Sequence, residues 1–439
     1  MISHSWQDRI RMSNPVRRTG RVRHIRATYL ETEGPALPLG AMCQVAGERH
    51  GRSAQLLAEV VRVSPTLVTL APLENGIAIA PDAEVVGLPS IDRVAVGPEF
   101  LGRVIDALGR PLDGRPGPSD SVMTPLQGRV PAPLERHSSR EQLVTGLRSI
   151  DGLLPLSRGQ RVGVFAAAGV GKTSLTAQLA SQIEADRVVI ALIGERGREV
   201  EALWSGFDAQ VRSRTTLVAA TADHPALARV RAADYAMALA EYWRDQGQHV
   251  LLLVDSATRL AMALREIGLA AGEPPTIRAY TPNVFAAIPR YVERAGAIRD
   301  GGSISAVLTV LSETDDLDDP VCEMMKSLLD GHILLSRALA DRGHFPAIDV
   351  PRSVSRQADR LRSPAHIAQS RRITSWVAAL ERSTTIRQAG LYATGSDPLV
   401  DDAVRLQSEI DHFLRQELAD PVGLRETWAA MARLCGEVV

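Results

Sequence analysis

The pattern of apolar and polar positions divides this chain into three stretches. Between residues 21 and 88, short apolar runs recur at intervals of about ten residues and are separated by Gly, Pro and acidic turns, which predicts a small β-barrel or sandwich. From about residue 145, strand-like apolar runs alternate with helical periodicity, as in a parallel sheet covered by helices. After about residue 367 no strand-like run remains, and amphipathic stretches predict a helical domain with helices over 368–390, 398–418 and 424–435.

The alternation in the middle of the chain predicts individual elements. We expect strands near 161–166, 188–193, 215–220 and 250–254, and helices over 172–184, 198–206 and 226–246. The Gly- and Pro-rich stretch 108–118 has the composition of a connector. We expect domains over residues 1–90, 91–367 and 368–439.

Composition limits the class of protein. A chain of 439 residues calls for two or three domains, and the net charge of −1 argues against a protein that holds nucleic acid electrostatically. We therefore expect no nucleic-acid partner. Positive charge is concentrated at the N-terminus, where seven arginines occur without an acidic residue between them: Arg9, Arg11, Arg17, Arg18, Arg21, Arg23 and Arg26. This arm is either a solvated tail or a contact for anionic lipid or an acidic partner.

Cysteine usage and hydropathy indicate a cytoplasmic protein. The three cysteines (Cys43, Cys322 and Cys435) form no CxxC motif, which fits a reducing compartment. No secretory h-region is present, and the longest aliphatic runs fall far short of the roughly 20 residues that span a bilayer. We expect any membrane association to be peripheral.

Residues 166–173 (Ala-Ala-Ala-Gly-Val-Gly-Lys-Thr) follow an apolar strand and open a helix, which is the context of a Walker A loop. Its glycines let backbone N–H groups turn onto phosphate, Lys172 would reach the β and γ phosphates, and the Thr173 hydroxyl would bind Mg²⁺. Ala166 replaces the first consensus glycine. The predicted ATP-binding residues are Ala168, Gly169, Val170, Gly171, Lys172, Thr173 and Ser174. The chain is therefore expected to be an α/β protein with a central RecA-like P-loop domain.

Two further segments complete the predicted chemistry. The run Val250–Val254 ends in Asp255, as in a Walker B strand, and this carboxylate would hold Mg²⁺ through water. Hydrolysis also requires a group that orients water, and the strand 188–193 is followed by Glu195 and Glu199. Chemistry alone leaves the choice between these two carboxylates open.

Five segments then show a family resemblance: LIGERGREV (192–200), LLLVDSATR (251–259), REIGLAAGEPP (265–275), SLLDGHILLSRALADRGHFPAIDV (327–350) and SVSR (353–356). Over about residues 20–420 the chain resembles the catalytic ATPase of type III secretion systems and its flagellar export counterpart, both relatives of rotary ATP synthase subunits. The resemblance implies a homohexameric ring that hydrolyses ATP with Mg²⁺ at the cytoplasmic face of the inner membrane. The implied partners are stator and central-stalk proteins, secretion chaperones and exported substrates.

The resemblance also assigns roles to residues. It selects Glu195 over Glu199 as the water-orienting carboxylate and places Arg196 near the γ phosphate or the subunit boundary. It makes Arg356 an arginine finger that enters the neighbouring subunit's site, and it matches Phe345 to the aromatic that packs on adenine. A lone aromatic before proline is also typical of a core residue, so both interpretations of Phe345 stay open. The acidic segment 315–320 resembles a pore- or stalk-facing loop but equally fits an ordinary surface turn.

Several alternatives remain at this point. A rotary ATP synthase catalytic subunit is disfavoured because that subunit resembles Asp-Asn-Ile-Phe-Arg where this chain has Asp255-Ser-Ala-Thr-Arg259. A Rho-like RNA translocase shares the Asp-Ser-x-Thr-Arg motif but is disfavoured by the near-neutral charge and the lack of an aromatic RNA platform. Residues 265–273 favour an injectisome and residues 395–398 a flagellum; we expect an injectisome ATPase, with the flagellar export ATPase as the alternative.

Overall fold

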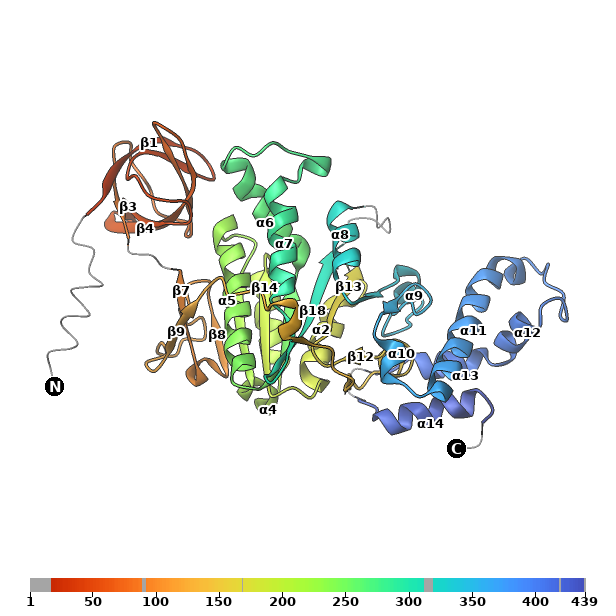
Figure 1. The fold of residues 1–439 in the computed structure, drawn as a ribbon. Coiled ribbons are helices and arrows are strands. Elements are labelled where there is room, and N and C mark those ends of the chain that lie inside the picture. The colour runs from red at the N-terminus through yellow and green to blue at the C-terminus, as the bar shows by residue number, and fades with distance from the viewer. Residues whose placement is uncertain (1–16, 89–91, 168, 312–318, 418–419, 438–439) are drawn as a thin grey trace, which may run out of the picture.

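The computed structural model describes residues 17–88, 92–167, 169–311, 319–417 and 420–437. Three parts follow one another along the molecule, with a barrel at one end, a helix-covered sheet in the middle and a helical part at the other end (Figure 1). This confirms the expected fold class. Among the described residues, no helix is long and apolar enough to cross a membrane.

The N-terminal part is a closed six-stranded barrel with strand order β1-β2-β5-β4-β3-β6. The alternating pattern buries one face of each strand inside the barrel, where Val22, Val45, Leu70 and Val85 are inaccessible to solvent. Its strands are β1 (Thr19–Ile25), β2 (Leu30–Glu33), β3 (Met42–Arg49), β4 (Arg52–Val63), β5 (Val68–Pro72) and β6 (Glu84–Gly87).

The central sheet runs in the order β20-β19-β13-β18-β16-β14-β15-β8. All neighbours from β19 to β8 are parallel, and β20 is antiparallel to β19. The strands are β8 (Arg103–Ile105), β13 (Arg161–Ala166), β14 (Arg187–Ile193), β15 (Thr215–Ala220), β16 (His249–Asp255), β18 (Ser303–Leu311), β19 (Gly331–Leu334) and β20 (Val354–Ser355). Short antiparallel strands complete this part: β7 (Arg93–Val96) with β9 (Val122–Pro125), β11 (Gln142–Leu143) with β12 (Leu156–Ser157), and β10 (Arg136–His137) with β17 (Gly296–Ile298), which pairs with β18.

Helices cover both faces of the sheet because its strands are apolar on both sides. On β14, Val189 and Ala191 pack in the core under α5 (Ala226–Asp245), α6 (Ala257–Ala270) and α7 (Pro282–Glu293). Their neighbours Val188 and Ile190 pack in the opposite core, under α2 (Lys172–Gln182) and α3 (Gly197–Gly206). The remaining α-helices in the described residues of this part are α4 (Ala209–Ser213), α8 (Pro320–Leu328), α9 (Arg337–Asp341) and α10 (Ala358–Leu361).

The C-terminal part consists of α11 (Pro364–Gln388), α12 (Pro398–Arg405), α13 (Gln407–Leu414) and α14 (Leu424–Leu434). The sequence predicted one helix over 398–418; the structure interrupts it at Leu406 and ends it at Leu414. It ends there because the next residues turn back, and the Gln416 N–H donates to the Phe345 carbonyl at 3.0 Å. The core under α2 continues into this part, with Trp376 and Met431 fully buried in it.

Candidate active site

The P-loop joins the carboxyl end of β13 to α2, as expected. Gly169 (φ 83°) and Gly171 (φ 95°) adopt positive φ, a conformation open to glycine without strain. Gly171 is the N-cap of α2, and no side chain among the described residues caps this end of the helix. The N–H groups of the first turn are therefore left to an anion. Of the predicted ligands, Thr173 and Ser174 are exposed on this turn and Val170 is buried beneath it, whereas Ala168 lies outside the described residues.

Lys172 stands between two carboxylates. Its Nζ donates to Glu195 Oε1 at 3.3 Å and also to Asp255 Oδ1. Asp255 ends β16, and Glu195 follows β14, the strand next to β16 in the sheet. The parallel sheet therefore brings Lys172, Glu195 and Asp255 together at one edge, as the sequence predicted for a P-loop fold.

Burial shifts the pKa values of the two carboxylates in this cluster. Loss of solvation raises the pKa of Asp255, an effect that the Lys172 ammonium partly offsets. Burial likewise raises the pKa of Glu195; Lys172 opposes this shift, and the nearby Glu199 carboxylate adds to it. Two carboxylates share one ammonium, so the cluster carries an excess of negative charge that suits a divalent cation.

Thr309 is a site residue that the sequence analysis missed. Its hydroxyl donates to Asp255 Oδ1 at 2.7 Å from the adjacent strand β18, and it is fully buried. Lys172 and Thr309 thus donate to the same oxygen of Asp255, and together they hold this carboxylate in place. Thr309 is one of three hydroxyl residues in the strand 303–311, which was not among the predicted strands.

Beside the P-loop lies a cavity of about 400 Å³. The Phe345 side chain is 49% exposed and lines this cavity, so Phe345 is not a core residue. A Cβ placed on Gly171 would lie 3.7 Å from the Phe345 ring, so the ring stands directly beside the phosphate loop. The C-terminal part lines the same cavity with residues that the sequence left unassigned: Arg415, Gln416 and Glu417.

Gln416 attaches these C-terminal lining residues to the central domain. Its side chain accepts from the Arg148 N–H at 3.0 Å and donates to the Gly146 carbonyl at 2.5 Å. Two residues distant in sequence, Phe345 and Gln416, thus form one pocket next to the P-loop. A larger cavity of about 640 Å³ opens at the amino ends of the strands, around His249 and Arg214, away from these groups.

The two predicted arginines lie outside this cluster. Arg196 is exposed at the N-cap of α3, and its guanidinium forms no ion pair with any residue the structure describes. Arg356 is exposed just after β20, and its Nη2 donates to the Lys326 carbonyl at 3.1 Å. Because β20 is antiparallel to β19 and Ser355 pairs with Gly331, Arg356 lies at the amino ends of the parallel strands. The P-loop is at the other end of β13, a strand of six residues whose ends are roughly 16 Å apart.

Two family models match the chain. The ATP synthase alpha/beta family nucleotide-binding domain matches residues 146–355, and the T3SS EscN ATPase C-terminal domain matches residues 362–433. The first contains the P-loop, Glu195, Asp255 and Phe345; the second begins just before α11 and includes the cavity wall at Arg415.

Full-length relatives agree with these matches. The flagellum-specific ATP synthase of Bacillus subtilis (strain 168) is 41% identical, with 99% of each chain covered. The type 3 secretion system ATPase of Pseudomonas savastanoi pv. phaseolicola is 43% identical, with 98% of this chain and 97% of the relative covered. Among solved structures, the assembled ATPase EscN with its central stalk EscO, from the type III secretion system of enteropathogenic E. coli, matches with a TM-score of 0.85 at 35% identity, covering 94% of this chain and 99% of the other. The chain therefore belongs to the family of flagellar and type III secretion ATPases, and it is an ATPase.

Proposed function

We propose that this chain hydrolyses MgATP in a homohexameric ring that energises protein export at the base of a type III secretion apparatus. The observation that carries the proposal is the separation of two groups in one chain. Lys172, Glu195 and Asp255 meet at the carboxyl ends of the parallel strands, whereas Arg356 lies at the amino ends. An arginine that acts on phosphate must then serve the site of another copy, and head-to-tail contacts of this kind close into rings.

Within one site, each group has a distinct task. The uncapped N–H groups of α2 and the Lys172 ammonium hold the β and γ phosphates. Thr173 and Asp255 would hold Mg²⁺, Asp255 through water, and Thr309 orients the Asp255 carboxylate. Bound there, the cation neutralises charge that develops between the β and γ phosphates.

Glu195 orients the attacking water and accepts its proton. Its raised pKa fits this role, because a base works best when its pKa approaches the working pH. Arg196, exposed beside it, reaches the γ phosphate or the subunit boundary. Phe345 stacks on adenine, with residues 415–417 closing the pocket. Arg356 from the neighbouring copy stabilises charge in the transition state.

The remaining partners follow from the relatives. A central stalk accompanies EscN, and we propose that a stalk protein, a stator, secretion chaperones and exported substrates contact this chain. We place it in the cytoplasm, peripheral to the inner membrane. Two of the seven arginines of the basic arm, Arg9 and Arg11, lie outside the described residues, as do residues 315–318 of the acidic segment. The other five lie on or beside β1, where Arg17, Arg23 and Arg26 form ion pairs with acidic residues of the barrel.

The injectisome is the proposed system, on the resemblance of residues 265–273. The flagellar export apparatus is the second candidate, because relatives from both systems match at 41–43% identity over nearly the whole chain. Deleting the gene in its host and measuring swimming motility and effector secretion separately tests this choice. Lost motility with normal secretion would overturn the injectisome assignment.

The ring mechanism is tested by mixing two inactive variants. We expect Lys172→Ala to abolish turnover and Arg356→Ala to retain ATP binding while losing most turnover. Mixed rings should regain activity wherever an intact site meets an intact Arg356. Near-normal turnover of Arg356→Ala, or no recovery on mixing, would contradict the mechanism.

A further inference from the structure

The chain that leads into Arg356 is held by other segments of the protein. The Arg356 N–H donates to the Asp330 carbonyl at 3.0 Å, and the preceding Ser355 hydroxyl donates to the Pro155 carbonyl at 2.6 Å. The Arg356 guanidinium itself is anchored only through the Lys326 carbonyl, among the contacts that the described residues make. The direction of this exposed side chain therefore depends on how firmly Asp330 and Ser355 are fixed.

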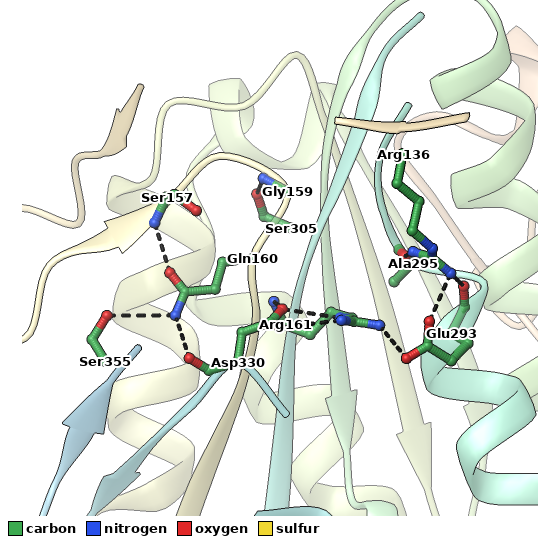
Figure 2. A network of polar contacts seen from close by, with 10 residues as sticks. All are labelled: Arg136, Ser157, Gly159, Gln160, Arg161, Glu293, Ala295, Ser305, Asp330 and Ser355. Atoms are coloured by element: carbon green, nitrogen blue, oxygen red, sulfur yellow. Dashed lines mark hydrogen bonds and ion pairs between the residues drawn. The ribbon is translucent and has the colours of Figure 1, made fainter. Parts of the chain in front are cut away.

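Asp330 is fixed by Arg161, the first residue of β13 (Figure 2). Its Oδ2 accepts from the Arg161 backbone N–H and from Nε, both at 3.0 Å, and its Oδ1 accepts from Nη2 at 3.1 Å. Two parallel bonds between a guanidinium and a carboxylate make a strong and directional ion pair. The Arg161 and Asp330 side chains are only 15% and 25% exposed, which limits screening by solvent.

Gln160 joins the two anchors. Its Nε2 donates to the Asp330 carbonyl at 3.1 Å and to the Ser355 hydroxyl at 3.5 Å, and its Oε1 accepts from the Ser157 N–H at 2.8 Å (Figure 2). On the other side, Arg161 also donates to Glu293 Oε1 at 2.7 Å. Asp330 thus sits at the centre of the contacts that reach Arg356, whereas Glu293 binds the far side of Arg161.

We propose that Asp330, held by Arg161, is a positioning residue for Arg356, in addition to joining the start of β13 to the start of β19. The proposal rests on the proposed role of Arg356 as an arginine finger. A finger must meet the transferring phosphoryl group within a narrow geometry, and a displacement of about 1 Å can cost up to a hundredfold in rate. Arg356 follows a strand of only two residues, so the pairing of β20 with β19 alone holds its backbone weakly.

A matched ion pair elsewhere in the same sheet provides the control. Arg103 Nε and Nη2 donate to Asp113 Oδ2 and Oδ1 at 2.6 and 3.1 Å, at β8 on the opposite edge. We expect Asp330→Asn to lower kcat about tenfold or more while leaving KM and the binding of a fluorescent ATP analogue unchanged. Asp113→Asn should lower Tm by at least as much as Asp330→Asn does, without lowering kcat. Equal losses of kcat in both variants would overturn the proposal.

Mixing separates positioning in trans from damage to the chain's own site. Asp330→Asn chains keep an intact P-loop, so adding Lys172→Ala chains, whose Arg356 is correctly placed, should restore turnover. Absence of restoration would show that Asp330 acts on its own site through β13, and would overturn the proposal. Arg161→Lys keeps the positive charge but loses the paired guanidinium bonds to Asp330. If Asp330→Asn folds poorly, Arg161→Lys serves as the second variant and should show the same loss of kcat.

The turnover of Arg356→Ala distinguishes failure of the proposed arginine finger from failure of its positioning by Asp330. If Arg356→Ala turns over normally, the proposed finger itself fails. If Arg356→Ala is inactive but Asp330→Asn keeps a normal kcat, only the positioning role fails.

Discussion

Lys172 Nζ lies 3.3 Å from Glu195 Oε1, so the P-loop lysine directly contacts one of the two carboxylates that follow β14. Glu199 stands behind Glu195 on the first turn of α3 and makes no ion pair with Lys172. We expect Glu195→Gln to lower kcat by about 10²–10⁴-fold, because it removes the base. Glu199→Gln should keep most of the activity. Phosphate release measured for both variants checks this, and the reverse order of activities would exchange their roles.

The same pair of carboxylates predicts a pH profile. Burial and then Glu199 raise the pKa of Glu195, so the acid limb of kcat/KM should lie above the ordinary glutamate value of about 4.3. Because Glu199 adds negative charge next to Glu195, Glu199→Gln should lower that pKa and move the limb to lower pH. Steady-state kinetics from pH 5 to pH 8 measure the shift; a limb that moves upward would contradict this electrostatic account.

Phe345 gives a prediction about nucleotide affinity. Since stacking on a base contributes about 1–3 kcal/mol, Phe345→Ala should raise KM for ATP by roughly 5- to 150-fold with a smaller effect on kcat. The side chain is 49% exposed, so its loss should cost little stability. Leu391→Ala, which removes an exposed apolar side chain outside the cavity, is the control. An unchanged KM in Phe345→Ala would exclude the stacking role.

His249 at the start of β16 should make stability depend on pH. Burial, with a contribution from Arg158, lowers the pKa of His249 from 6.5 to about 4. The folded state disfavours the protonated ring, so this contribution to stability is complete above pH 6.5 and is lost as the pH falls towards 4. Its size between pH 7.5 and pH 5 is about 2 kcal/mol.

Chemical denaturation of wild type and His249→Gln at both pH values isolates this contribution. The wild type should lose more free energy of unfolding than the variant on acidification. Equal losses in the two proteins would show that His249 does not titrate on unfolding in this range.

Much of this fold could be predicted from the sequence because its strands are buried on both faces. Such strands appear as unbroken apolar runs, and β13, β14, β15 and β16 lie within one or two residues of their predicted positions. The strand β18, central in the sheet, was not predicted, because Ser303, Ser305 and Thr309 interrupt its apolar run. The P-loop and Asp255 were found because each stands at the carboxyl end of such a strand, whereas the choice of Glu195 over Glu199 came from the family resemblance alone.

Pairings between distant segments were not accessible in the same way. The proximity of Phe345 to residues 415–417 depends on how the C-terminal helices pack, which no local pattern encodes. The ion pair between Arg161 and Asp330 spans 169 positions and joins two unremarkable charged residues. The location of Arg356 at the amino ends of the strands follows from the antiparallel direction of β20, a two-residue strand too short to be predicted.

The P-loop lies at the carboxyl end of β13, and Arg356 lies at the amino ends of the strands. This separation determines how many complete sites an assembly contains. Under the proposed mechanism a lone chain has no complete site, and an open row of n chains has n − 1, because the first finger and the last P-loop stay idle. Closing the row into a circle adds one working site without adding a chain. Specific activity should then fall steeply on dilution, so that the local concentration of subunits, set by whatever recruits them, acts as the switch for ATP consumption.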